Sequence, residues 1–345
     1  MEKVKKMLPK FCGFLFFGTM CTFVSAQKIN YQVNPQTGAL QTLSIANDPQ
    51  KMNWLVVTDG SQYRWVKENY GWGLGYATQV KGNRKEKVSW EIPAEMKQEG
   101  NELVYMAGDI RICVKRKMVE DELIEEYTFR NQGKDKVALV DIGVYTPFND
   151  NYPGSRTCIN TRTNTHIWEG ENAAYVNALR MGGHAPHLGL VLTKGAVKGY
   201  EIWERGRDKG NSHTRGIIAL NLPDLQLMPG KEYSMSWCLF AHKGIDDFRQ
   251  KLLEKGSVFV SCNKYVFEKG EKACIELAAE TSIQKCVLKN QDIHIPMKKR
   301  GNLWIAEVKM DQLGENRFDI FYGKGKQTHV TCLVIDNVDS LIKKR

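Results

Sequence analysis

Several short motifs that mark enzyme and metal sites are missing from this chain of 345 residues. Its nine cysteines form no C-x-x-C pair, so the usual zinc-knuckle and thiol-redox patterns are excluded. There is no H-E-x-x-H zinc motif, no G-x-S-x-G nucleophile turn and no G-x-G-x-x-G between a strand and a helix. We therefore expect neither a metal nor a cofactor, and the motifs assign no catalytic residue.

Long apolar runs are also missing after the first 26 residues, which form a signal peptide by pattern. Residues 3–10 carry lysines, residues 11–23 are apolar and too short to span a bilayer, and residues 24–26 are small. We expect cleavage before Gln27, export across the inner membrane, and a periplasmic or cell-surface location.

Charge of one sign is not concentrated in any long segment. The net charge of +10 becomes +7 on processing, because residues 1–26 hold four lysines and one glutamate. Short basic clusters at residues 115–117, 298–300 and 343–345 are typical of solvated faces, and we expect no nucleic-acid partner. Mild basicity would help to steer an acidic polysaccharide or oligosaccharide toward the protein. The seven cysteines of the processed chain are expected to be mostly buried free thiols, in no pairing that spacing can define.

Helical periodicity is nearly absent, and alternating apolar and polar residues between Gly and Asn turns predict strands. The fold class is therefore all-β. We expect a large antiparallel β-supersandwich over residues 27–244, a linking helix over 245–256, and a small Ig-like β-sandwich over 257–335.

Two helices are predicted. In residues 245–255, Phe248 and Leu252 share a face and Gly256 closes the helix, which we interpret as a hinge between domains. In residues 336–345, Asp336 or Asn337 caps a helix that begins as the chain ends. We interpret this last segment as the start of a truncated helix, with a short C-terminal helix as the alternative.

Residues 145–187 are the strongest candidate for a binding site, because they are too polar for a core and too aromatic for an ordinary linker. Long irregular segments in compact domains are often functional. Aromatic rings beside planar polar groups suit a sugar, whose CH groups stack on rings. The candidate substrate-binding residues are Asp150, Arg162, His166, Trp168, Tyr175, Arg180 and His187. The alternative is a structural crossover with His166 and Trp168 in the core.

A further group of residues could line the same cleft: Tyr200, Trp203, His213 and Arg215. The glycines at positions 71, 73 and 75 favour a kinked strand over a ligand-binding loop.

The chain resembles a family of large secreted bacterial proteins of unknown function that look polysaccharide-active. The resemblance rests on residues 146–150, His166-Ile167-Trp168, residues 180–183 and the Asp247-Phe248 helix. It implies a galactose mutarotase-like β-supersandwich, an Ig-like domain, and then an (α/α)6 six-hairpin-type toroid that is absent here. Polysaccharide lyases acting on rhamnose–glucuronate linkages are a related group.

Three functions remain open. The first is a secreted, non-catalytic front portion of a polysaccharide-degrading enzyme, a glycoside hydrolase or polysaccharide lyase, which contributes a glycan-cleft wall and scaffold to a missing C-terminal catalytic domain. The second is a stand-alone carbohydrate-binding or structural envelope protein. The third is a lyase or mutarotase-like enzyme with its site in the sandwich, using His166 or His187 as base.

Overall fold

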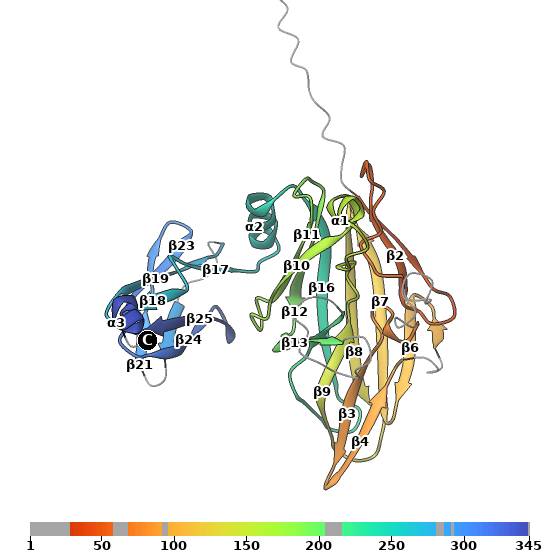
Figure 1. Ribbon diagram of the computed structural model, residues 1–345. Coiled ribbons are helices and arrows are strands. Elements are labelled where there is room, and N and C mark those ends of the chain that lie inside the picture. The colour runs from red at the N-terminus through yellow and green to blue at the C-terminus, as the bar shows by residue number, and fades with distance from the viewer. Residues whose placement is uncertain are drawn as a thin grey trace, which may run out of the picture.

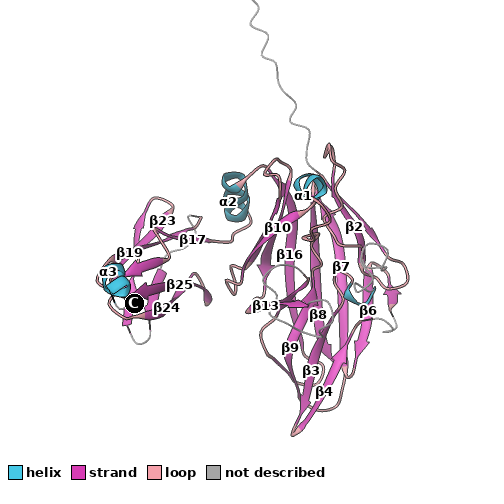
Figure 2. Cartoon of the chain, in the orientation of Figure 1, coloured by secondary structure: helices cyan, strands magenta, loops and turns pink. Residues whose placement is uncertain are grey.

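The computed structural model describes residues 28–57, 68–91, 96–203, 216–280, 286–290 and 293–343. The predicted signal peptide lies outside these residues. Within them the chain is built almost entirely from strands in mostly antiparallel sheets, which confirms the predicted all-β class (Figure 2).

The first unit is a sandwich of two large antiparallel sheets (Figure 1). The eight-stranded sheet has the order β10 (Thr163–Trp168), β11 (Tyr175–Arg180), β12 (His187–Lys194), β16 (Glu232–His242), β8 (Glu122–Asn131), β7 (Ile110–Val119), β6 (Glu102–Ala107) and β5 (Lys97–Glu99). The six-stranded sheet has the order β13 (Gly199–Trp203), β14 (Ile217–Asn221), β9 (Val137–Tyr145), β3 (Gly75–Lys81) and β4 (Arg84–Ser89), with β15 (Leu225–Leu227) beside β9. A hairpin of β1 (Ile29–Val33) and β2 (Leu40–Ile45) and a 3-10 turn, η1 (Glu68–Tyr70), complete the unit.

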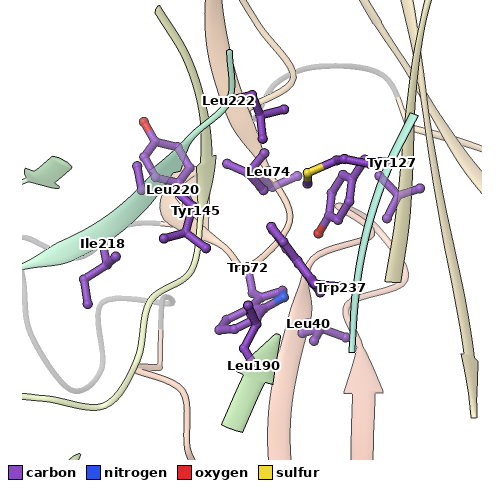
Figure 3. Packing of buried hydrophobic residues seen from close by; sticks show 14 of the residues in the cluster. Leu40, Trp72, Leu74, Tyr127, Tyr145, Leu190, Ile218, Leu220, Leu222 and Trp237 are labelled. Atoms are coloured by element: carbon purple, nitrogen blue, oxygen red, sulfur yellow. The ribbon is translucent and has the colours of Figure 1, made fainter. Parts of the chain in front are cut away.

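The core of this sandwich forms because alternate residues of each strand point inward. Figure 3 shows Trp72, Leu190 and Trp237 packed together, with Leu220 of β14 and Leu222, which directly follows this strand. Large aromatic rings fill the centre; for example, the Trp72 and Trp237 rings lie 6.5 Å apart, nearly perpendicular.

Arg116 and Glu125 form a charged pair inside this apolar core. Glu125 occupies an inward position of β8 and is fully buried. Its Oε2 accepts hydrogen bonds of 2.7 Å from the indole N–H groups of Trp72 and Trp237, and its Oε1 accepts one of 2.5 Å from Nε of Arg116. Arg116 also donates to the carbonyl of Gly38. The interpretation of residues 115–117 as a solvated face is therefore wrong for Arg116, which pairs across the strands with Glu125.

The predicted linking helix is α2 (Ile245–Glu254), and it ends as its sequence indicates. Gly256 adopts a φ of 71°. The backbone N–H of Gly256 donates to the carbonyl of Leu253, and the backbone N–H of Ser257 donates to the carbonyl of Leu252. These are the two bonds of a Schellman motif. Phe248 and Leu252 are buried against the outer face of the eight-stranded sheet, so α2 is packed onto the first unit beside the second (Figure 1).

The second unit is a smaller sandwich. One sheet has the order β17 (Phe259–Cys262), β19 (Lys272–Ala278), β23 (Leu303–Lys309) and β22 (Lys298–Arg300). The other has the order β18 (Val266–Glu268), β25 (Lys326–Ile335), β24 (Gly314–Tyr322), β20 (Cys286–Asn290) and β21 (Ile293–Pro296). The pair β18–β25 is parallel, whereas the other pairs are antiparallel. The helix α3 (Val338–Lys343) follows, and Oδ1 of Asn337 accepts the amide N–H of Asp339 as a cap.

The segment 145–187 is not irregular, which corrects the sequence prediction. It contains the helix α1 (Ser155–Thr161) and two paired strands, β10 and β11. The alternation of β10 is hidden because its inward residues include Thr163 and Thr165, which do not read as apolar. Polar composition was therefore a poor guide to backbone order here.

Candidate functional site

A pocket of about 370 Å³ opens where the two sheets of the first unit present their end strands. It is lined by Asp150 and Tyr152 from the loop between β9 and α1, by residues 163–167 of β10, and by Tyr200 of β13. Each of β10 and β13 has one neighbouring strand among the described residues. An edge strand presents backbone N–H and C=O groups outside its ladder, so these two edges add polar partners to the pocket.

The lining combines exposed rings with small polar groups. Tyr152 is 46% exposed and Tyr200 is 43% exposed, unusual values for large aromatic side chains. Asp150 lies in the same lining as Thr163 and Thr165, the inward residues of β10, whereas Asn164 and His166, which also border the pocket, alternate with these threonines along the strand. Rings that stack on CH groups, beside planar groups that bond hydroxyls, suit a sugar ring.

The pocket loop is held by a chain of side-chain hydrogen bonds that begins at Arg162. Its Nε donates to Oδ1 of Asn151 at 2.6 Å, Nδ2 of Asn151 donates to Oδ1 of Asn149 at 2.9 Å, and Nδ2 of Asn149 donates to the carbonyl of Asn53. Asn149 and Asn151 are buried. Arg162 does not line the pocket; it fixes the loop that carries Asp150 and Tyr152.

Trp168 and Tyr175 lie elsewhere, at the junction of the two units. The Trp168 ring stacks on His329 of β25 at 5.6 Å and on Tyr175 at 6.4 Å. Tyr175 in turn contacts Phe248 of α2 and Phe259 of β17. Burial raises the pKa of the Tyr175 hydroxyl to about 12, so it stays neutral at physiological pH.

Polar contacts reinforce this junction. Arg317 of β24 pairs with Glu171 at 2.8 Å, and the side-chain oxygen of Asn172 accepts the amide N–H of Gln327 at 3.0 Å. The turn between β10 and β11 is therefore the part of the first unit that touches β24 and β25. This turn belongs to the segment predicted to bind sugar, and these contacts are with the second unit.

Arg180 and His187 are buried inside the first unit. Nη2 of Arg180 pairs with Oδ1 of Asp48 at 2.8 Å, and its guanidinium lies 5.6 Å from the centre of the Trp54 ring. Nδ1 of His187 accepts the backbone N–H of Arg180. Burial and the nearby Arg180 charge lower the pKa of His187, so its imidazole is neutral near pH 7.

The structure thus divides the seven predicted residues among four places. Asp150 and His166 line the pocket, Arg162 anchors its loop, Trp168 and Tyr175 join the units, and Arg180 and His187 lie in the interior. Tyr152 was not in the predicted set. Its neighbours in the sequence, an acid and two asparagines, were the signal that could have identified it.

The second predicted group also separates. Tyr200 lines the pocket. Trp203 instead packs with Tyr76 and Tyr145, whose hydroxyls donate to Glu201 at 2.7 Å and to Glu91 at 2.5 Å respectively. His213 and Arg215 lie outside the described residues.

Two kinds of feature are absent from the described part of the chain. It holds no group of three or more His, Cys, Asp or Glu side chains arranged to bind a metal ion. It also contains no helix long and apolar enough to cross a membrane.

Trp168→Ala is expected to destabilise the chain by about 1–3 kcal/mol. The substitution removes a half-buried indole together with its ring contacts to Tyr175 and His329. Urea denaturation measures this loss, and limited proteolysis should cut sooner between the units. Trp168→Phe, which keeps a ring, is the control. Unchanged stability together with lost glycan binding would contradict the structural role.

Comparison with known proteins adds one strong similarity. No protein-family model and no curated protein matches the chain. A solved structure named a polysaccharide lyase aligns with 93% of this chain at 56% identity, with a TM-score of 0.87. The alignment covers 48% of that protein, so this chain spans about half its length. A galactose mutarotase-related enzyme from Lactobacillus acidophilus aligns with 64% of this chain and 97% of its own at 10% identity and a TM-score of 0.37, which is too low to bear on function.

Proposed function

We propose that this chain is the secreted, glycan-binding front portion of a polysaccharide-degrading protein, and that the pocket between β10 and β13 forms part of its glycan cleft. The observation that carries this proposal is the pocket lining, in which two exposed tyrosines accompany Asp150 and the threonines of β10. The polysaccharide lyase that matches 93% of the chain supports the same class of ligand.

Binding would follow from this lining. The faces of Tyr152 and Tyr200 offer stacking surfaces for the CH groups of a pyranose. Asp150 accepts hydrogen bonds from sugar hydroxyls, and the Thr165 hydroxyl both donates and accepts. The loop needs no large rearrangement, because Arg162, Asn151 and Asn149 already hold it in place.

The proposal assigns bond cleavage to sequence outside this chain. The polysaccharide lyase has about as much further sequence as it shares with this chain, which leaves room for a separate catalytic domain in such proteins. We include export to the periplasm or cell surface in this proposal, because the protein would encounter polysaccharides in those locations. A stand-alone carbohydrate-binding protein would use the same pocket without that further domain.

A second candidate is lyase activity within the sandwich, favoured by His166 and two tyrosine hydroxyls lining one pocket. In β-elimination a base removes the proton next to the uronate carboxylate, and the glycosidic oxygen leaves with a proton from an acid. Unsaturated uronate absorbance produced by this chain and lost in His166→Ala would establish it. His187, which is buried and accepts a backbone hydrogen bond, is poorly placed for this role.

Arg162→Ala tests how the pocket is built. Affinity electrophoresis of the chain against pectin, alginate, hyaluronan, heparin and arabinogalactan should first identify a retarding polysaccharide. The variant should then bind it about 5- to 10-fold more weakly, because loss of one charged hydrogen bond costs about 1–1.5 kcal/mol and loosens the loop.

Arg156→Ala is the matched control, since Arg156 is exposed on α1 close by. It should bind as the unmodified chain does. Failure of every polysaccharide to retard the unmodified chain, or equal binding by the Arg162 variant, would count against the proposed pocket.

A further inference from the structure

Cys262 points into the interior of the second unit. It lies on β17 directly opposite Ile275 of β19, and directly paired residues of an antiparallel ladder share a face. Ile275 is fully buried in the core of this unit, so the Cys262 side chain faces the same core while remaining partly accessible. Cys274, the neighbour of Ile275, points to the opposite, outer face.

Cys332 points into the same interior from the facing sheet. It lies on β25 between Val330 and Val334, and these three alternate residues are buried whereas Leu333 is 39% exposed. Cys332 belongs to the apolar cluster against which Cys262 packs. Both side chains therefore face one core from its two sheets, and β17 and β25 contact each other.

The two thiols have different reactivities. Interaction with Cys332 lowers the pKa of Cys262, so more of Cys262 is thiolate near neutral pH than of an ordinary cysteine. The same interaction and burial raise the pKa of Cys332. A partly accessible thiolate next to a protected thiol is the arrangement of an attacking and a resolving cysteine.

We propose that Cys262 and Cys332 form a disulfide that joins the two sheets of the second unit, by exchange with an external disulfide such as oxidised glutathione or that of a thiol oxidoreductase. The Cys262 thiolate attacks the external disulfide, forms a mixed disulfide and releases one thiolate. The Cys332 sulfur, after losing its proton, attacks Cys262 and releases the second. Two protein thiols are oxidised and one external disulfide is reduced to two thiols. The exchange does not depend on the proposed glycan binding.

The bond would stabilise the unit because it closes the long chain segment from β17 to β25, which restricts the unfolded state. In a unit of this size the melting temperature should rise by about 5 °C or more.

In the test, the purified chain is first reduced. It is then equilibrated with a mixture of oxidised and reduced glutathione at a potential of about −200 mV. Alkylation in denaturant followed by intact mass should show two fewer modified thiols than in the reduced chain, and peptide mapping should recover Cys262 linked to Cys332. The melting temperature should be higher in the oxidised sample, and the gain should vanish in Cys262→Ser and in Cys332→Ser. Cys274→Ser should keep both the linkage and the gain, since its side chain lies on the outer face.

The mass measurement on the unmodified chain shows whether the disulfide forms, even if a variant fails to fold. Full alkylation after oxidation would overturn the proposal. So would a linkage of Cys262 to Cys274, or glutathione retained on Cys262 as a stable mixed disulfide.

Discussion

Glu125→Ala is expected to lower the free energy of unfolding by about 3–5 kcal/mol, a large share of the stability of an ordinary domain. The substitution leaves the guanidinium of Arg116 without its carboxylate, although that side chain is only 5% exposed. It also removes the acceptor of the indole N–H groups of Trp72 and Trp237. A buried charge and two buried donors would therefore lose their partner together.

Glu126→Ala is the matched control for this prediction. Glu126 follows Glu125 on β8 but faces outward, where it lies 3.5 Å from Lys194 in an exposed pair. Exposed pairs contribute about 0–1 kcal/mol, so its loss should be small. Urea denaturation of both variants gives the comparison, and equal stabilities would show that the buried network does not hold the sandwich together.

Most strands of the second unit could be predicted from the sequence. Alternation and Gly turns are local signals, and they predict eight strands there, each overlapping a strand of the structure: 258–260, 265–267, 273–277, 285–288, 293–297, 303–308, 317–322 and 328–335. The ninth, β22, was not predicted because Lys298–Arg300 is fully exposed and carries no apolar pattern. It forms because β23 offers a free edge.

The candidate site was predicted less well, and the reason is distance along the chain. Arg180 looks like a ligand-binding residue until its partner Asp48, 132 positions earlier, is placed beside it (180 − 48 = 132). Trp168 likewise meets His329 of the second unit. Asp150 and His166 were predicted because both lie in a segment whose composition suits sugars, but composition does not show which side chains face the same space.

Replacing both pocket tyrosines should have the largest effect on function. Each exposed ring contributes apolar stacking area worth about 1.5–3 kcal/mol when covered by ligand. Tyr152→Ala and Tyr200→Ala should therefore each weaken binding about 10- to 100-fold, and the double variant should show no measurable binding. Folding should survive, because both rings are more than two-fifths exposed.

The most direct measurement is isothermal titration of the polysaccharide found by electrophoresis into the unmodified chain, the Tyr152→Ala/Tyr200→Ala variant and a Tyr265→Ala control. Tyr265 is equally exposed, at 48%, but belongs to the second unit. If the pocket between β10 and β13 binds the glycan, the unmodified chain and the control will bind alike, and the double variant will not bind while its melting temperature stays close to theirs. Undiminished binding by a folded double variant would contradict the assignment of the glycan site to this pocket.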